Sequence, residues 1–550
     1  MRIPSRLGVA MLAATVACTS PENGATVGDV GGTLVIALPA EPRSVLPPFL
    51  SGSQEREISE QLFDVLADIG PDLNTIGDVG WKPRLAESWQ WSADSMSIAF
   101  KLDPRAHWHD GRRITSADVR FSVELNKDPV TVSRLARALA DVDSVSTPDS
   151  VTAIVWYSKR SPEQFYNVAY NLALLPAHLL RDADRSSLQS HPFARNPVGS
   201  GPFRFSRWEP ASLFEVIADT SYYLGRPLLN RVIWVLHTDP NTALETVIAG
   251  DADVFESMTT DGMARVAGHE LVRAVPYPTL NYGFLGFNLR DRNNGDRPHP
   301  LFADRELRRA IAMALNRPLL VANVYDSLAQ VGAGPFSREF PTADTTLRSV
   351  AFDSVGADRL LDSLGWNDGN GDGVREKGGR ALRFGIVFPT TSPQRRRLSE
   401  LIQAQLKSHG IQVDVEAADL TVFGPRLFTG KFDAMLHNWA LEPSPSRVRD
   451  HWHTFPASSR ALNLQLYSNP VVDAALDSAI AEHDTARSRA LYRKAYQAIT
   501  DDLPAVWLFE NKAYMAIHNR VQANLSAPDV WWRNLRLWSI PASKRIPRDG

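Results

Sequence analysis

The stretch from Pro83 to Ser122, PRLAESWQWSADSMSIAFKLDPRAHWHDGRRITSADVRFS, decides the fold of this chain more than any other segment. Within it, apolar residues alternate with other side chains as they do in a half-buried strand: Ile98, Phe100 and Leu102. The triplet HDG at 109–111 predicts a turn. Thr115 stands three residues before Asp118, which is the spacing of a capping box at a helix start. The stretch therefore predicts a hairpin followed by a helix, a packing pattern that carries no chemistry.

The size and charge of the chain limit its class. It has 550 residues, enough for two to four domains of about 100 to 200 residues each. Hydrophobic residues make up 44% and charged residues 22%, which is ordinary for a soluble globular protein. Because the formal net charge is only -3, there is no basic excess to attract a phosphate backbone, and we expect no nucleic-acid partner.

The first seventeen residues predict a secretion signal peptide. Arg2 and Arg6 precede an apolar run over 7–17, which is too short for a bilayer that needs about 20 residues. No later segment reaches the length of about 18 uninterrupted apolar residues that a membrane-spanning helix needs. We therefore expect a protein that is exported and whose body does not span the membrane.

Cys18 follows this run directly and is the only cysteine of the chain, so no internal disulfide forms. The residues at 14–17, ATVA, resemble the lipobox of bacterial lipoproteins, with Thr15 where leucine is most usual. We expect Cys18 to carry a lipid and residues 18–32 to form a flexible tether; the alternative is a buried cysteine that acts as a small hydrophobe. The expected location is the periplasm or the cell surface.

Other segments along the chain also carry distinctive sequence patterns. They are NPVGSGPFRF at 196–205, SYYLGRPLLNRVIWVLHTDPNTALETVIAGDADVF at 221–255, LGFNLRDRNNGDRPHPLFADRELRRAIAMALNRPLLVANVY at 285–325 and DSAIAEHDTARSRALYRKAYQAITDDLPAVWLF at 477–509. Together with Pro83 to Ser122 they resemble, in the same order, the family 5 bacterial extracellular solute-binding proteins. This family includes the dipeptide, oligopeptide and nickel-chelate receptors of ABC importers. The resemblance covers nearly everything after the tether.

The resemblance implies a two-lobed periplasmic-binding-protein-like fold of class C, also called type II. Strand and helix patterns alternate along the chain, which independently favours an α/β architecture. The implied domains are a discontinuous first lobe at 33–60, 195–280 and 505–550, an inserted small domain at 61–194 and a second lobe at 281–504. Lobes joined by two chain crossings can hinge around a ligand.

The resemblance also points to ligand-binding residues. In the peptide-binding members, an acidic residue shortly after a tryptophan in the second lobe pairs with the amino-terminal ammonium of the peptide. Trp439 and Glu442 match these places, although aspartate is more usual at the second. A charge-assisted hydrogen bond of this kind strengthens when closure excludes water. The alternatives are a solvated Glu442 at a strand end and a Trp439 that belongs to the core.

The residues after the first strand would face the cleft by the same resemblance, which adds Ala40 and Glu41 to the candidate binding residues. In relatives this loop offers backbone groups to an extended ligand, as an added strand would. Glu41 is also compatible with an ordinary surface glutamate.

Two patterns resemble parts of metal sites, but we assign no metal-binding residue to either. The triplets HWH at 107–109 and 451–453 would place paired histidines on one face of a strand, and His451 with His453 stays open as a site for a metal chelate. The segment DGNGDG at 368–373 matches the first half of a calcium loop, but Gly379 stands where a bidentate glutamate is required. An Asx-rich turn is the expected structure there.

No enzyme motif is present in the sequence: there is no GxSxG, HExxH, Walker loop or GxGxxG after a strand. We therefore expect no catalytic residues and no cofactor. The predicted function is a monomeric receptor of an ABC importer that captures peptides between its lobes and delivers them to the permease. The alternatives are a nickel-chelate, oligosaccharide or opine receptor on the same scaffold and, more remotely, a periplasmic hydrolase or sensor.

Overall fold

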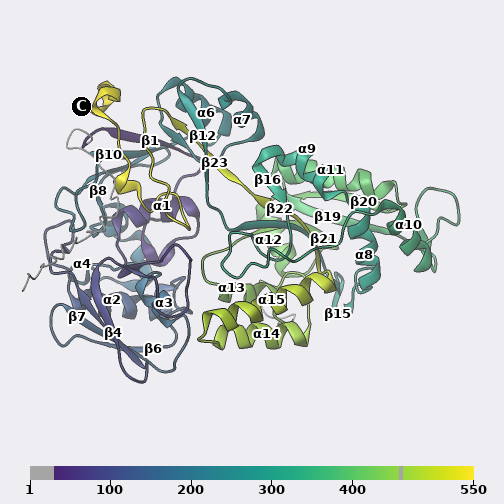
Figure 1. Ribbon diagram of the computed structural model, residues 1–550, viewed down its shortest axis with the longest axis horizontal. Helices are drawn as coiled ribbons and strands as arrows, with labels where there is room; N and C mark the ends of the chain where they lie inside the picture. Colours follow the sequence, from purple (N-terminus) through teal and green to yellow (C-terminus); the bar gives the residue numbers. More distant parts are fainter. Residues whose placement is uncertain (1–29, 457–461) are drawn as a thin grey trace, which may run out of the picture.

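The computed structural model describes residues 30–456 and 462–550, and its ribbon forms two large masses that meet near the middle of the molecule (Figure 1). The predicted signal peptide of residues 1–17 and the predicted lipidation site Cys18 lie outside the described residues. None of the helices in the described ranges combines the length and the apolar character needed to cross a membrane.

The first lobe is built on a seven-stranded sheet with the strand order β12-β23-β11-β1-β10-β9-β8. Three separate parts of the chain supply its strands: β1 Thr33–Leu38; β8 Phe203–Glu209, β9 Leu213–Ala218, β10 Arg231–Leu236, β11 Val254–Phe255 and β12 Val272–Tyr277; and β23 Ala513–His518. β1 is buried along its whole length because it lies parallel between β10 and β11. The helices that contact these strands are α1 Ser53–Leu62, α6 Pro240–Ala249 and α7 Thr260–Val266.

The small domain, as the name is used here, consists of a four-stranded antiparallel sheet and the helices around it. The strand order is β4-β5-β7-β6, with β4 Ala86–Trp91, β5 Ser97–Leu102, β6 Val142–Ser146 and β7 Thr152–Tyr157. Its helices are α2 Ser116–Lys127, α3 Gln164–Ala169, α4 Ala177–Leu180 and α5 Pro192–Arg195. In Figure 1 this domain lies below the sheet of the first lobe, on the same side of the molecule.

The second lobe is built on a six-stranded sheet with the order β16-β22-β13-β21-β19-β20. Its strands are β13 Asn281–Phe287, β16 Ala329–Val331, β19 Arg383–Pro389, β20 Gln412–Ala418, β21 Ala434–Ala440 and β22 Ala505–Asn511. Its helices are α8 Arg305–Ala314, α9 Arg317–Tyr325, α10 Ser354–Ser363, α11 Pro393–Lys407, α12 Leu420–Phe428, α13 Ser446–Trp452, α14 Pro470–Ala481 and α15 Thr485–Asp502.

Short elements complete the described chain. The two-stranded ladders are β2 Ala67–Asp68 with β3 Lys82–Pro83, β14 Arg290–Asp291 with β15 Asn294–Pro298, and β17 Glu376–Lys377 with β18 Arg380–Ala381. Short 3₁₀ helices are Pro47–Phe49, Pro129–Thr131, Arg185–Ser190, Asp326–Leu328, Leu535–Leu537, Ala542–Lys544 and Pro547–Asp549.

Two chain crossings join the sheet of the first lobe to that of the second. β12 leads into β13 through residues 278–280, and β22 leads into β23 through Lys512. Both crossings lie between the two masses in Figure 1. Short connections of this kind are where hinge motion between lobes takes place.

Local sequence signals set several elements. The segment of alternating residues around Ile98 forms β5, in which Ile98 and Phe100 are completely buried while Lys101 is exposed. The predicted capping box is present, because the Asp118 carboxylate accepts hydrogen bonds from Thr115 N at 2.8 Å and Thr115 Oγ1 at 3.0 Å. The predicted hairpin and helix of the opening stretch are therefore confirmed.

The glycines of NPVGSGPFRF bring the chain directly against the end of α1. The backbone N–H groups of Ser200 and Gly201 donate to Leu62 O at 2.8 and 2.9 Å. A Cβ added at Gly199 would lie 1.8 Å from Leu62 O, and one added at Gly201 would lie 2.4 Å from Gln61 O. Only glycine permits this approach, so these two positions hold the return from the small domain to the first lobe in place.

Candidate functional site

The segment that carries the predicted ligand residues is the end of β21 and the loop that follows it. β21 pairs with β13 from Ala434 to Ala440, but β19 pairs only with Ala434 and Met435. The later part of β21 therefore has a strand neighbour on one side only among the described residues. An unpaired strand edge of this kind can bind an extended chain through backbone hydrogen bonds.

Glu442 lies just beyond β21 in a cavity of about 430 Å³ between the small domain and the second lobe, here called the outer cavity. Its carboxylate oxygens lie 3.9 Å from Arg134 Nη1 of the small domain and 3.9 Å from Arg447 Nη2 of α13. Both distances exceed hydrogen-bond length. The side chain retains 30% of its accessible surface, so a donor that enters the cavity reaches the carboxylate.

Trp439 is held between two histidines. Its indole stacks on His451 of α13 with ring centroids 4.1 Å apart and an interplanar angle of 8°, and it meets His437 edge-on at 4.5 Å. Burial, with the positive charges of neighbouring arginines, lowers the pKa of each of these two histidines to about 3. Both imidazoles are therefore neutral near pH 7, and Trp439 is half-buried against the core.

Two further predicted ligand residues, Ala40 and Glu41, follow β1 of the first lobe. Both are exposed, and the Glu41 carboxylate accepts a hydrogen bond from Trp208 Nε1 of β8 at 3.4 Å. β8 is the edge strand of the first-lobe sheet furthest from β12. Neither residue lines the outer cavity with Glu442. Their role in binding stays a prediction.

A second cavity, of about 370 Å³, lies at the chain crossings between the first and second lobes and is here called the hinge cavity. Glu256 and Tyr514 line it from the first lobe, and Arg395 and Asn438 line it from the second. Because Asn438 precedes Glu442 by four residues, the segment from Asn438 to Glu442 passes from one cavity to the other.

Arg395 is the charged residue that sequence reasoning missed. It lies in the first turn of α11, and its guanidinium donates a hydrogen bond to Asn438 Oδ1. Burial lowers its pKa, and among the described residues it forms no ion pair with a carboxylate. A partly buried guanidinium without a carboxylate partner favours an anionic group of a ligand. The sequence signal was the run of three arginines at 395–397, in which nothing distinguishes the one that enters the cavity.

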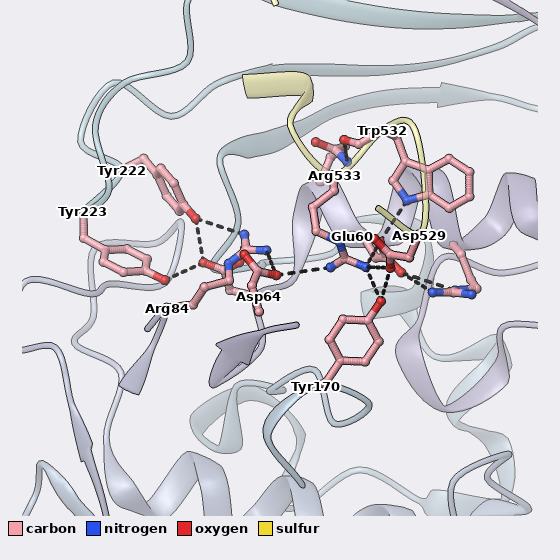
Figure 2. Close-up of polar contacts among 12 residues, drawn as sticks. Glu60, Asp64, Arg84, Tyr170, Tyr222, Tyr223, Asp529, Trp532 and Arg533 are labelled. Atoms are coloured by element: carbon pink, nitrogen blue, oxygen red, sulfur yellow. Dashed lines mark hydrogen bonds and ion pairs between the residues drawn. The ribbon is translucent and has the colours of Figure 1, made fainter. Parts of the chain in front are cut away.

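A buried polar network joins the first lobe to the small domain (Figure 2). At one end, Asp64 accepts hydrogen bonds from the hydroxyl groups of Tyr222 at 2.8 Å and Tyr223 at 2.7 Å, and it forms an ion pair with Arg84. Burial raises the pKa of Asp64, while the Arg84 guanidinium opposes this. The carboxylate is thus surrounded by donors from the protein itself.

At the other end of the network, Arg533 of the C-terminal segment contacts the side chains of Asp529, Tyr170, Glu60 and Asp68. Its Nη2 lies 2.8 Å from Asp529 Oδ2 and 2.5 Å from the Tyr170 hydroxyl. Trp532 Nε1 donates to Glu60 at 2.8 Å. Burial alone would raise the pKa of Glu60, but the Arg533 charge among others lowers it to about 2.

This network gives the first lobe and the small domain a shared, buried set of charges. Glu60 comes from α1, Arg84 from the start of the small domain and Arg533 from the C-terminal segment (Figure 2). Breaking one partner of a buried pair leaves an uncompensated charge and is strongly destabilising. The network therefore fixes the first lobe and the small domain to each other. We expect movement between lobes at the two crossings that lead to the second lobe.

The histidines of the second HWH triplet do not share a face. The segment is not a strand: His451 lies in α13 and His453 is the residue that follows it. Residues two apart on a helix point about 200° away from each other. His451 stacks on Trp439, whereas His453 Nε2 lies 3.2 Å from Asp477. The strand geometry behind the suggested chelate site is therefore wrong.

The DGNGDG segment brings three surface carboxylates together. Oxygens of Asp368, Asp372 and Glu376 lie within 4.8 Å of one another. The Asp368 carboxylate already accepts the backbone N–H groups of Gly371 at 2.7 Å and Gly373 at 2.9 Å. These hydrogen bonds are those of an Asx-rich turn.

Comparison with known proteins shows which chains this one is similar to. The relatives include the oligopeptide-binding protein AppA of Bacillus subtilis, which is 27% identical over 531 residues that cover 94% of each chain. The solved structure of this AppA with a nonapeptide superposes with a TM-score of 0.76 at 24% identity, covering 93% of this chain and 99% of that one. NikZ of Campylobacter jejuni, solved with Ni(L-His), gives 0.76 at 23% identity, with 92% and 99% coverage.

These structures share the fold, and their ligands differ, so the fold alone does not name a ligand. The two-lobed α/β architecture that the sequence implied is confirmed. The family described as bacterial extracellular solute-binding proteins, family 5 (middle region), matches residues 80–454. This match spans the sheet of the small domain, most of the residues that line the outer cavity and most of the second lobe. The chain therefore belongs to the family 5 bacterial extracellular solute-binding proteins.

Proposed function

We propose that this protein is the substrate-binding component of an ABC importer and that it captures peptides between its lobes. The observation that carries the proposal is the separation of opposite charges along one strand end. Glu442 presents a carboxylate in the outer cavity, and Arg395 presents a guanidinium in the hinge cavity. A peptide has the complementary charges, an ammonium at one end and a carboxylate at the other.

The segment between the two cavities sets the length of such a ligand. Four residue steps separate Asn438, which contacts Arg395, from Glu442. At about 3.3 Å per residue in an extended chain, this is about 13 Å. An extended peptide of about four or five residues would therefore reach both charges, and a longer one would need to bend or leave the cavities.

The strand edge supplies recognition that does not depend on side chains. Beyond Met435, β21 has no pairing with β19 and keeps backbone groups for a ligand that lies beside it. Hydrogen bonds to peptide groups give affinity without reading the sequence of the peptide. Trp439, which is partly exposed, supplies an apolar surface for one ligand side chain.

The two arginines near Glu442 decide how the ammonium is held. Arg134 and Arg447 each lie 3.9 Å from the carboxylate, so neither takes up its hydrogen-bonding positions. An ammonium binds in a stronger, shorter charge-assisted bond, while the arginines limit how negative the outer cavity becomes. We infer that the cavity favours a primary ammonium over a bulky dication.

The remaining parts of the proposal concern location and partners. Lipidation of Cys18 would hold the protein at a membrane surface, where a monomer would deliver its ligand to the permease. Extracellular location follows from the family. A receptor role needs no catalytic group, and we propose that the protein performs no chemistry on its ligand.

The proposal is tested by the ligands that the protein carries. The purified protein is unfolded, and the released small molecules are identified by mass spectrometry. The most abundant peptide is then synthesised in three forms, with free ends, with an acetylated amino terminus and with an amidated carboxyl terminus, and each is titrated by calorimetry. If no peptide is carried, a random tetrapeptide library replaces it.

We expect tight binding of the free peptide and a loss of affinity on blocking either end. Equal binding of all three forms would remove the end-recognition mechanism. A released metal chelate, sugar or opine would keep the receptor and replace the ligand class. A peptide that is cleaved during incubation would overturn the assignment as a receptor without activity.

A further inference from the structure

Glu163 is a buried carboxylate at the contact between the small domain and the second lobe. It retains 8% of its accessible surface. Its Oε1 accepts a hydrogen bond from Thr75 Oγ1 at 2.5 Å, and its Oε2 accepts one from Ser444 Oγ at 2.7 Å and another from Ser446 Oγ. Thr75 lies in the loop between β2 and β3, which is hydrogen-bonded through Gly77 N to Pro162 O beside Glu163, whereas the two serines follow β21 of the second lobe.

This carboxylate has hydroxyl groups as its partners and forms no ion pair with a cation among the described residues. A buried carboxylate is costly unless its lone pairs are hydrogen-bonded. Both oxygens of Glu163 are bonded, and Oε2 obtains its donors only from across the contact between the lobes. When the lobes separate, Glu163 keeps Thr75 and exchanges the serines for water.

The serines lie in the loop that carries the proposed ligand carboxylate. Ser444 and Ser446 follow Glu442 by two and four residues. Glu163, Glu442 and both serines line the outer cavity together. A contact that fixes the serines therefore also fixes the position of Glu442 relative to the small domain.

Other contacts across this boundary are more exposed. Arg137 lies 3.1 Å from Asp450, but its side chain is 77% accessible. Asn74 accepts a hydrogen bond from Thr485 at 3.4 Å. Exposed ion pairs contribute little to stability because water screens them, whereas hydrogen bonds to a buried charged group contribute more. Glu163 is thus the strongest single polar contact in this group.

We propose that Glu163 is a positioning residue that docks the loop from Leu441 to Ser446 onto the small domain and so couples closure of the lobes to the placement of Glu442. The role of Glu442 in this statement rests on the proposed function, whereas the docking of the loop does not. Glu163 itself touches the loop and not the ligand.

The test measures lobe closure and binding separately. Spin labels are placed at the exposed positions Ser150 and Ala474 by substitution with cysteine in the chain carrying Cys18→Ser, which then has no other cysteine. The distance distribution between the labels is recorded without ligand and with a saturating random tetrapeptide library. The variants compared are Glu163→Ala, Glu163→Gln and the double variant Ser444→Ala/Ser446→Ala.

We expect Glu163→Ala and the double serine variant to lower the ratio of closed to open molecules about tenfold, which corresponds to the loss of hydrogen bonds to a charged group. The dissociation constant of the library peptides should rise by a similar factor. Glu163→Gln keeps one oxygen acceptor and should restore part of the closure.

Two controls separate positioning from folding. Thr75→Val removes the donor from the side of Glu163 itself and leaves the contact across the lobes, so closure should stay near that of the wild type. Glu124→Gln on α2 changes an exposed glutamate of the same domain. If Glu163→Ala closes like the wild type with its fold intact, or if the ligand-free wild type is entirely open, the positioning role is overturned. Absence of peptide binding with an intact effect on closure would overturn only the proposed function.

Discussion

Trp439 and His451 stack face to face, with ring centroids 4.1 Å apart, and so join the end of β21 to α13. The contact holds the two elements that flank the loop of Glu442. Because the imidazole is buried beside this ring, its protonation would place a charge in an apolar setting. The ligand loop is therefore supported by a residue that must stay neutral.

The first prediction concerns acid stability. Burial, with the charge of Arg447, lowers the pKa of His451 from 6.5 to about 3 in the folded protein. The unfolded state takes up a proton on this group as pH falls below 6.5, whereas the folded state does not. The stabilising effect is therefore complete above pH 6.5 and is lost as pH falls towards 3. His451→Phe should reduce the slope of the free energy of unfolding against pH in this range by at most about 1.4 kcal/mol per pH unit.

Urea unfolding between pH 3.5 and 7.5 measures this effect. His191→Phe serves as the comparison, since His191 precedes α5 of the small domain, an element that carries neither Trp439 nor α13. An unchanged pH slope for His451→Phe would mean that His451 is not the group that titrates on unfolding.

The second prediction concerns Glu442. Glu442→Gln removes the charge and should weaken binding of a free tetrapeptide by about 10- to 100-fold, since a hydrogen bond to a charged group contributes about 1.5–3 kcal/mol. An amino-terminally acetylated peptide should bind the variant and the wild type equally weakly. Calorimetric titration gives the four constants, with Glu400→Gln on the exposed face of α11 as the matched control. Equal losses for both peptides would contradict ammonium recognition.

The third prediction concerns the opposite end of the ligand. Arg395→Ala should weaken binding of a peptide with a free carboxyl terminus and leave binding of its amide nearly unchanged, because only the first carries the charge that the guanidinium attracts. Arg397→Ala is the control, since Arg397 lies on the same helix and is exposed. If Arg395→Ala weakens both peptides alike, Arg395 serves the hinge and not the ligand.

The fourth prediction concerns the return of the chain to the first lobe. Gly201→Ala should destabilise the protein by about 1–3 kcal/mol, because the added Cβ would lie 2.4 Å from Gln61 O and backbone atoms must shift. Gly369→Ala meets no atom within 4 Å and should unfold like the wild type. Thermal unfolding of both variants decides this, and similar midpoints would show that the backbone at Gly201 has room to move.

Several elements could be predicted from the sequence because local rules govern them. The alternation in β5 and the capping box at Thr115 depend on neighbours within a few residues. The second HWH triplet was misjudged because three residues are too few to distinguish a strand from the short helix α13. Longer periodic segments carry the information that such a triplet lacks.

Parts of the candidate site depend on contacts that no local pattern contains. Arg395 stands in a run of three arginines, and only the orientation of α11 selects it for the hinge cavity. The contact of Glu163 with Ser444 joins residues 281 positions apart. Distant partners of this kind come together through the packing of whole elements, so the sequence around each residue does not reveal them.

The sequence by itself determined the α/β class, because strand and helix patterns alternate along it, and through its resemblance to the family it also implied the two-lobed plan and the position of Glu442 after Trp439. The tertiary structure alone decided which charges meet. Among the described residues, it placed Arg134 and Arg447 beside Glu442, left Arg395 without a carboxylate partner and enclosed Glu163 with serines of the second lobe. Electrostatic and hydrogen-bonding partners depend on distances of a few ångströms across the folded chain, and only folding sets those distances.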